Sequence, residues 1–242
     1  MCTLIALFNA CPNAPLVLAL NRDELLSRPT EPVHRWTAPN IVAGRDVVAG
    51  GTWFAVGERV VAALTNHRAG AVPPARGERS RGDLVVRAAS AQSTEEIASF
   101  IAEEPGRAYG GFHLLACDGR RLRCFTNRSG AITEEPAGDG VHVLGNLGID
   151  DPSDPIVQAV RPAATALLRD DVDVLVDEDG LVGGLQAILR RHGDGWPCVH
   201  FGRYGTRMSA ILLWREVAPR LLLTDGPSCE SPWHERGDLL ST

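Results

Sequence analysis

Cys2 is the residue that gives this chain its clearest chemical possibility. If Met1 is removed, which a small second residue such as cysteine permits, Cys2 carries both a thiol and a free α-amine. Unperturbed pKa values are about 8.5 for a thiol and about 7.7–8.0 for an α-amine, so both groups titrate near working pH. The amine can then accept the proton of the thiol, as in covalent catalysis by an activated nucleophile. Cysteine is also a common buried apolar residue, so Cys2 alone leaves a structural role open.

Further polar residues follow apolar runs, at positions where a buried strand would end. They are Arg22, Asp23, Asn66, Asn146 and Arg207. A thiol that cleaves an amide needs donors for the developing oxyanion, and removing one such donor costs about 10²–10³ in rate. Arginine and carboxylate groups can tune the thiolate. Taken singly, each of these residues is better explained by a hydrogen bond at a turn or strand end.

The composition excludes several classes of function. The net charge is 24 − 30 = −6, which gives no electrostatic reason to expect nucleic acid or an anionic membrane as partner. No apolar run approaches the roughly 18 residues of a membrane span, and no basic region precedes the first apolar run as in a secretory signal. All 24 basic residues are arginine, so chemistry that needs a lysine is excluded. We expect a cytoplasmic protein.

The six cysteines stand at wide and irregular intervals, at positions 2, 11, 117, 124, 198 and 229. They form no Cys-x-x-Cys pair, and none combines with a histidine at the spacing of a structural zinc site. The spacing therefore predicts free thiols in a reducing compartment and no metal site.

The apolar pattern predicts strands and helices in separate runs. We predict strands at 2–8, 15–21, 53–56, 60–66, 112–117, 123–127, 141–144, 208–214 and 220–224. We predict helices at 83–91, 94–104 with Thr94 as N-cap, 155–168 and 181–191. Prolines predict a surface loop over 25–45; a second loop is expected at 202–207 and an irregular tail from 228. This order predicts an α+β fold of mainly antiparallel sheets covered by helices, in a single domain of residues 1–242.

A polar segment, residues 67–83, contains four arginines. They are Arg68, Arg76, Arg79 and Arg81. Arginine offers a planar fork of donors to carboxylate or phosphate, so the segment could hold an anion. A solvated loop is the simpler interpretation.

Seven short motifs, spread in order along the chain, resemble those of the NRDE family, also called the transport-and-Golgi-organisation family. They are Asn21-Arg22-Asp23-Glu24, Gly50-Gly51-Thr52-Trp53, Ala63-Leu64-Thr65-Asn66, Arg81-Gly82, Gly111-Phe112, Gly145-Asn146 and Tyr204-Gly205-Thr206-Arg207. The resemblance implies the N-terminal-nucleophile hydrolase fold, a four-layer α-β-β-α sandwich of two stacked sheets. In outline the chain is also similar to choloylglycine hydrolases and penicillin V acylases, which likewise open with Met-Cys-Thr.

The similarity to those acylases implies a catalytic set, carried over by position. It comprises Cys2, Arg22, Asp23, Asn66, Asn146 and Arg207. Other residues of these motifs, and His67 directly after one of them, are expected to bind substrate: Asn21, Glu24, Trp53, His67 and Tyr204. There is one departure, because the acylases separate the early arginine and aspartate by two residues, whereas Arg22 and Asp23 are adjacent. Adjacent side chains of a strand point to opposite faces, so only one can face Cys2 unless a bulge intervenes.

Three functions remain open at this point. The first is an N-terminal cysteine amidohydrolase that acts on a small non-peptide amide and requires no cofactor. The second is a carrier of haem, acyl-CoA or another lipid conjugate, since the family is associated with haem trafficking and lipid homeostasis. Haem would take an axial His, Cys or Met, and His67, beside Asn66, is the first histidine to test. The third is a pseudo-enzyme that serves as a protein-interaction module.

Overall fold

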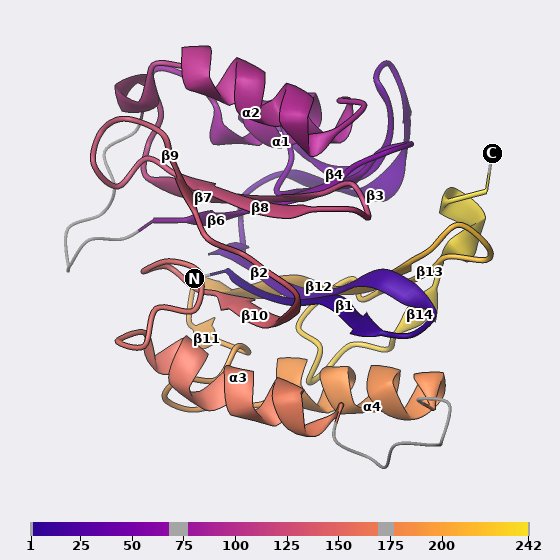
Figure 1. The fold of residues 1–242 in the computed structure, drawn as a ribbon. Helices are drawn as coiled ribbons and strands as arrows, with labels where there is room; N and C mark the ends of the chain where they lie inside the picture. The colour runs from indigo at the N-terminus through magenta and orange to yellow at the C-terminus, as the bar shows by residue number, and fades with distance from the viewer. Residues whose placement is uncertain (1, 68–76, 169–176, 242) are drawn as a thin grey trace. The chain divides into compact units, whose positions relative to one another are not determined.

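The computed structural model describes residues 2–67, 77–168 and 177–241. Within these residues the chain forms two compact units, and each contains one antiparallel sheet and two α-helices (Figure 1). The first unit takes the described residues of 1–27, 139–145 and 150–242, and the second takes those of 28–138 and 146–149. The chain therefore leaves the first unit after two strands and returns to it for its C-terminal part.

The sheet of the first unit has seven strands among the described residues. In spatial order they are β10 (Gly140–Leu144), β1 (Thr3–Cys11), β2 (Ala14–Leu25), β12 (Tyr204–Trp214), β13 (Arg220–Leu223) and β14 (His234–Glu235), with β11 (His200–Phe201) paired to β12. The strand β2 pairs with β1 along one edge and with β12 along the other. Residues from both ends of the sequence therefore meet along β2.

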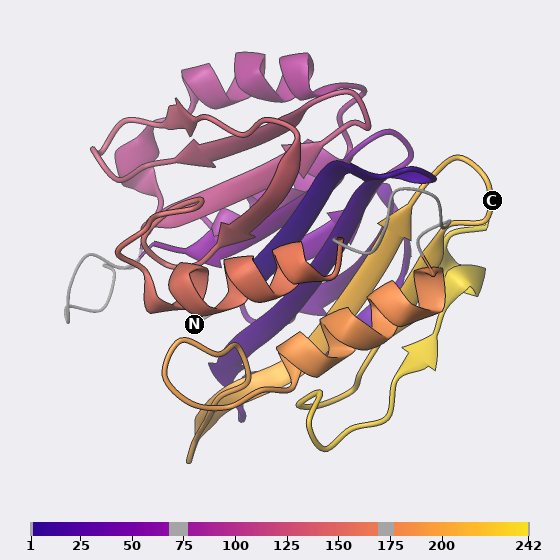
Figure 2. The same ribbon diagram turned by 60° about the horizontal axis from the view of Figure 1, so that its bottom comes forward.

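Two helices, α3 (Pro155–Ala166) and α4 (Glu178–Leu189), lie across one face of this sheet (Figure 2). The helix α3 begins after Asp154, whose side chain accepts a hydrogen bond from the N–H of Ile156 and so caps the helix. The apolar sides of both helices and alternate residues of the strands form one core. This core includes Ile5, Leu7, Val17, Ala19, Val143, Val160, Leu185, Ile211 and Leu213.

The sheet of the second unit also has seven strands in the described part of the chain, and they follow one another in sequence order. They are β3 (Thr30–Thr37), β4 (Asn40–Asp46), β5 (Phe54–Val56), β6 (Val61–Asn66), β7 (Phe112–Cys117), β8 (Leu122–Thr126) and β9 (Thr133–Glu135). The helices α1 (Arg81–Ala89) and α2 (Thr94–Glu103) cover one face of it (Figure 1). Short 3-10 helices stand at Gly106–Ala108 in this unit and at Gly237–Leu239 in the first.

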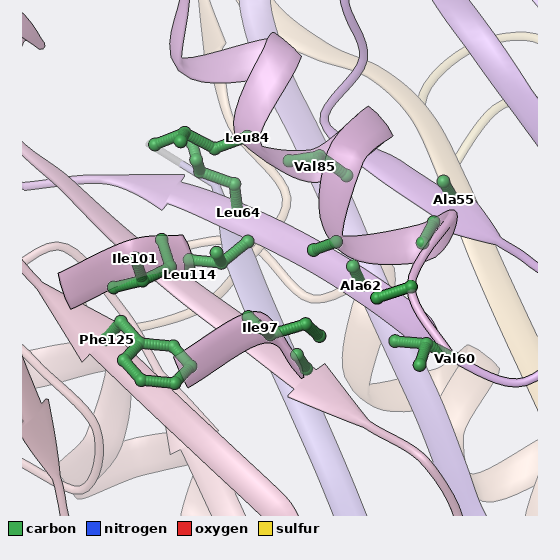
Figure 3. Packing of buried hydrophobic residues seen from close by; sticks show 14 of the residues in the cluster. Ala55, Val60, Ala62, Leu64, Leu84, Val85, Ile97, Ile101, Leu114 and Phe125 are labelled. Carbon is green, nitrogen blue, oxygen red and sulfur yellow. The ribbon is translucent and has the colours of Figure 1, made fainter. Parts of the chain in front are cut away.

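Side chains from α1 and α2 meet alternate residues of the second sheet in a packed apolar core (Figure 3). The residues labelled there are Ala55, Val60, Ala62, Leu64, Leu84, Val85, Ile97, Ile101, Leu114 and Phe125. Alternate residues of a strand share one face of the sheet, and residues three or four apart share one face of a helix, so these side chains all point into the space between the sheet and the helices. Each unit thus has a hydrophobic core of its own between its sheet and its helices.

Most predicted elements are confirmed, but the surface loop predicted over 25–45 is wrong. The segment forms the hairpin of β3 and β4, in which Trp36 Nε1 donates to the backbone oxygen of Ala43 at 3.0 Å. The prolines are tolerated because β3 is the edge strand of its sheet and its register shifts between Glu31 and His34, around Pro32.

Smaller differences concern where elements begin and end. The strand β2 runs on through Leu25, and β12 begins at Tyr204 inside the segment predicted as a loop. Ser93, not Thr94, caps α2, since its hydroxyl accepts from the N–H of Glu96. The tail expected to be irregular from 228 contributes β14 and a short 3-10 helix.

Apolar segments of the chain are short and buried. All six residues of β7 are buried, as expected for a strand with apolar residues on both faces. The longest described helices, α3 and α4, have 12 residues each, and none of the described helices is long and apolar enough to cross a membrane.

Candidate functional site

Cys2 lies directly before β1, beside the adjoining end of β2. Its side chain is partly buried, and Sγ lies 3.8 Å from the backbone oxygen of Asp23. In the register of the two strands Thr3 faces Asn21, so the next pair along places Cys2 opposite Arg22. Opposite residues of an antiparallel pair project to the same face. The thiol and the Arg22 guanidinium therefore share one face of the first sheet.

The carboxylate of Asp23 lies on the other face of this sheet. Thr206, opposite Asp23 on β12, donates its hydroxyl to Asp23 Oδ1 at 2.7 Å. Two residues earlier on β2, Asn21 Nδ2 donates to the backbone oxygens of Leu189 in α4, at 2.9 Å, and of Pro197, at 3.0 Å. The nearby register shift falls in β12, between Thr206 and Met208, so β2 alternates regularly here and only Arg22 faces Cys2.

The backbone of Asp23 is held from the neighbouring strand. Its carbonyl oxygen accepts a hydrogen bond from the hydroxyl of Tyr204 at 3.2 Å, in addition to the contact with Cys2 Sγ. The Thr206 hydroxyl that binds the carboxylate itself accepts from the N–H of Val199 at 3.1 Å. Tyr204 and Thr206, both from the Tyr204-Gly205-Thr206-Arg207 motif, thus hold β2 at Asp23, whose backbone oxygen contacts Cys2 Sγ.

Arg207 and Glu24 organise the end of β2. Arg207 is the extra residue of the β12 bulge, and its Nη1 donates to the backbone oxygens of Leu26, at 2.7 Å, and Leu25, at 3.3 Å. Glu24 Oε1 accepts from the N–H of Leu25 at 2.8 Å. Both side chains therefore contact the backbone at the point where the chain leaves the first unit.

The surroundings of Cys2 hold its thiol in the neutral form. Burial raises the pKa of the Cys2 thiol above its ordinary value of 9.0, and the negative charge of Asp23 acts in the same direction. The Arg22 guanidinium opposes both effects. The thiolate is the reactive form of cysteine, so a nucleophilic role of Cys2 requires a base that removes this proton.

A second group of predicted residues lies in the second unit, around the backbone carbonyl of Asn146. His67 Nδ1 lies 3.2 Å and His113 Nε2 lies 3.4 Å from this oxygen. The side-chain amide of Asn146 donates to the backbone oxygen of Asn66, the last residue of β6. The two imidazole rings meet edge to face, with their centroids 5.1 Å apart. The structure therefore brings Asn66, His67 and Asn146 together and adds His113.

Burial lowers the pKa of His67 below its ordinary value of 6.5. His67 is therefore neutral near pH 7, and a neutral imidazole carries one N–H and one free lone pair. If Nδ1 carries the hydrogen and donates it to Asn146, Nε2 is the nitrogen that can accept or bind.

Trp53 packs against the neighbouring strand β4. Its ring lies against Gly44 of β4 so closely that a Cβ at Gly44 would come within 2.5 Å of it. This contact explains why a glycine stands at position 44.

The predicted anion-binding segment is only partly described. Arg68 and Arg76 lie outside the described residues. Arg79 Nη1 donates to Glu104 Oε2 at 2.6 Å, and Arg81 Nη1 donates to the backbone oxygen of Gly111 at 3.1 Å. Both arginines donate hydrogen bonds to acceptors within the protein, which is consistent with a structural role.

Two residues of these groups were missed by the sequence reasoning. Thr206 lies inside a recognised motif, but only the β2–β12 register shows that its hydroxyl reaches Asp23. His113 is an ionisable residue within the six buried residues of β7. An ionisable residue inside an apolar run is unusual, and this feature could have marked His113 as a candidate site residue.

A comparison with solved structures defines the class of fold. The chain is similar to the Caenorhabditis elegans orthologue of N-acylethanolamine-hydrolyzing acid amidase, with a TM-score of 0.57 and 13% sequence identity. The similarity covers 88% of this chain and 92% of that one. This likeness confirms the predicted class, an α+β fold of the N-terminal-nucleophile hydrolase type.

The sequence profile of the family Transport and Golgi organisation 2 matches residues 1–197. Related proteins include the Transport and Golgi organization 2 homologues of Mus musculus and Homo sapiens, which are 27% and 29% identical to this chain over 231 residues. Each alignment covers 82% of this chain and 81% of the relative. The chain belongs to the Transport and Golgi organisation 2 family, as its motifs predicted.

Proposed function

We propose that this protein is an N-terminal cysteine amidohydrolase that cleaves a small N-acyl amide. The observation that carries the proposal is the position of Cys2, which stands at the end of β1 with Arg22 on the same face of the first sheet. The fold supports it, because the structural neighbour is by its name an enzyme that hydrolyses N-acylethanolamines.

The proposed reaction begins when the α-amine of Cys2, freed by removal of Met1, takes the proton of the thiol. The sulfur attacks the amide carbonyl carbon, the carbon–nitrogen bond breaks, and the amine leaves with that proton. Water then hydrolyses the thioester to release the acid and restore the thiol. Met1 lies outside the described residues, so its removal is part of the proposal.

Within this scheme Arg22 stabilises the thiolate, because an adjacent positive charge favours the ionised form. Asp23 has a positioning role: its carboxylate binds Thr206, and its carbonyl contacts Cys2 Sγ. The scheme needs no cofactor, and it suits the reducing cytoplasm, where thiols stay free.

The experiment is a hydrolysis assay on a panel of N-acyl amides, N-acylethanolamines among them, with intact-mass measurement of the same protein. The proposal expects turnover by protein that lacks Met1 and none by the variant Cys2→Ala. Cys11→Ala is the matched control, since Cys11 is another partly buried free thiol near the far end of β1. Hydrolysis that survives in Cys2→Ala would overturn the proposal.

A second candidate, haem binding, is favoured by one observation on His67. A histidine that binds a metal usually donates its other ring N–H to a carbonyl or carboxylate, and His67 Nδ1 lies 3.2 Å from the Asn146 oxygen. The lowered pKa of His67 keeps its ring neutral, as an axial ligand must be. Iron bound by Nε2 would hold haem as cargo; acyl-CoA or another lipid conjugate is the other cargo the family suggests.

Haem titration separates this candidate from the hydrolase. A saturable Soret shift that is lost in His67→Ala and kept in Cys2→Ala would establish it, with His34→Ala as the exposed-histidine control. A response equal to that of an unrelated protein would rule it out.

A further inference from the structure

Four metal-ligating side chains converge in the first unit: His192, Cys198, His200 and Cys229. One ligand atom from each lies within 4.8 Å of those of all the others. The two sulfurs are 3.5 Å apart, and His200 Nε2 lies 3.7 Å from Cys198 Sγ and 3.2 Å from Cys229 Sγ. The imidazoles of His192 and His200 have centroids 5.1 Å apart. The spacing of the cysteines in sequence gave no sign of this cluster.

Local backbone structure explains how Cys198 and His200 come to point the same way. They stand two residues apart on the segment that leads into β11, which is held to β12 by Val199. The N–H of Val199 donates to Thr206 Oγ1 at 3.1 Å, and its oxygen accepts from the N–H of Thr206 at 2.9 Å. Side chains at i and i+2 of an extended segment share a face.

The other two ligands are brought in from either side of this segment. His192 follows α4, and the N–H of Cys198 donates to the backbone oxygen of Arg191 at 3.0 Å. Cys229 follows Ser228, whose hydroxyl donates to the backbone oxygen of Leu189 at 2.9 Å. The helix end, the β11 segment and the C-terminal segment therefore meet at the cluster.

The three distances among Cys198, His200 and Cys229 are close to those of tetrahedral coordination. Zinc binds sulfur at about 2.3 Å and imidazole nitrogen at about 2.0–2.1 Å, so a tetrahedral site has edges of about 3.8 Å between sulfurs and about 3.6 Å between sulfur and nitrogen. The observed values of 3.5 Å, 3.7 Å and 3.2 Å lie close to these edges. Two thiols and two imidazoles are also the donor set that selects zinc among common cations.

We propose that His192, Cys198, His200 and Cys229 form a structural zinc site. With four protein ligands no coordination position is left for water or substrate, which is the mark of a structural site rather than a catalytic one. The zinc would tie α4, the β11–β12 hairpin and the C-terminal segment together. His200 pairs with Gly205 of β12, next to the Thr206 that binds Asp23. The zinc site would therefore stabilise the part of β12 that holds β2 at Asp23. This inference goes beyond the proposed function and does not depend on it.

The first test measures zinc in the full-length protein, purified with a reductant, loaded with zinc and dialysed against metal-free buffer. We expect one zinc per chain by elemental mass spectrometry. Cobalt(II) in place of zinc should give the thiolate charge-transfer and tetrahedral d–d absorption bands of a site with two sulfur ligands. Wild-type protein that retains no zinc, or cobalt spectra without thiolate bands, would overturn the proposal.

Variants locate the metal. Cys198→Ser and Cys229→Ser should each abolish zinc retention and the rise in Tm on adding zinc, because a ligand that binds only the folded state raises its stability. Cys11→Ser, with a free thiol outside the cluster, should retain zinc like the wild type; circular dichroism checks that all three variants fold. Equal zinc retention by the wild type and the double variant Cys198→Ser/Cys229→Ser would contradict the assignment. So would an intact mass two hydrogens low under reducing conditions, since it would show that a Cys198–Cys229 disulfide is the stable state.

Discussion

Arg22 and Asp23, adjacent in sequence, project from opposite faces of β2, and only Arg22 shares the face of Cys2. The guanidinium shares the face of the thiol and lowers its pKa, whereas the Asp23 carboxylate binds Thr206 on the other face and raises that pKa by its negative charge. The two residues therefore have different surroundings, although they are adjacent in the motif.

Arg22→Gln should lower hydrolysis without unfolding the protein. Loss of the positive charge removes one of the effects that lower the pKa of the Cys2 thiol, so this pKa rises further. We expect slower alkylation of Cys2 by iodoacetamide and an alkylation profile shifted to higher pH. An unchanged profile would show that Arg22 does not act on the thiol.

Thr206→Val should destabilise the protein by about 1–3 kcal/mol, the cost of leaving buried polar groups without a hydrogen-bond partner. The hydroxyl serves both Asp23 Oδ1 and the N–H of Val199. Urea unfolding measures the effect, and Thr206→Ser, which keeps the hydroxyl, is the control that should stay near wild type. Equal stability of the two variants would contradict the role given to this hydroxyl.

Asn21→Leu tests whether Asn21 is structural or binds substrate. Its side chain donates to the carbonyls of Leu189 and Pro197 and accepts from the hydroxyl of Ser209 at 2.6 Å. Removing these bonds should cost about 1–3 kcal/mol for each group left unsatisfied, measured by urea unfolding. A rise in KM without loss of stability would instead indicate contact with substrate.

Stability should fall at alkaline pH because of buried thiols. Burial raises the pKa of Cys117 to about 12 and that of Cys11 to about 11, from an ordinary value of 9.0. The unfolded chain therefore loses these protons before the folded chain does. The contribution is complete below pH 9 and is lost as the pH rises through the folded values, with a slope of about 1.4 kcal/mol per pH unit for each thiol. Cys117→Ser should show a smaller decline between pH 9 and 12; an identical decline would contradict this assignment.

The sequence was sufficient to predict the strands and helices that have regular apolar periodicity. The strand β7 was predicted with its observed bounds, Phe112–Cys117, because six consecutive apolar or buried-type residues lie between clear turn residues. The hairpin of β3 and β4 was missed because its prolines suggested a loop, and only the position of β3 at a sheet edge makes them acceptable.

The candidate site was likewise predicted only in part from the sequence. Motifs indicated Cys2, Arg22 and Asp23, and strand alternation correctly restricted one of the last two to the Cys2 face. The zinc ligands could not be found from spacing, because Cys229 joins the others only through the packing of the C-terminal segment against α4. Contacts between distant segments depend on tertiary structure, which local patterns do not encode.

The central claim is that Cys2 is an N-terminal nucleophile, and trapping its acyl intermediate tests it most directly. Active protein mixed with an N-acyl amide, quenched in acid and analysed by intact and peptide mass spectrometry should lack Met1 and carry the acyl group on the peptide that begins with Cys2. Active protein that retains Met1, or one whose acyl group lies on another residue, would contradict the account.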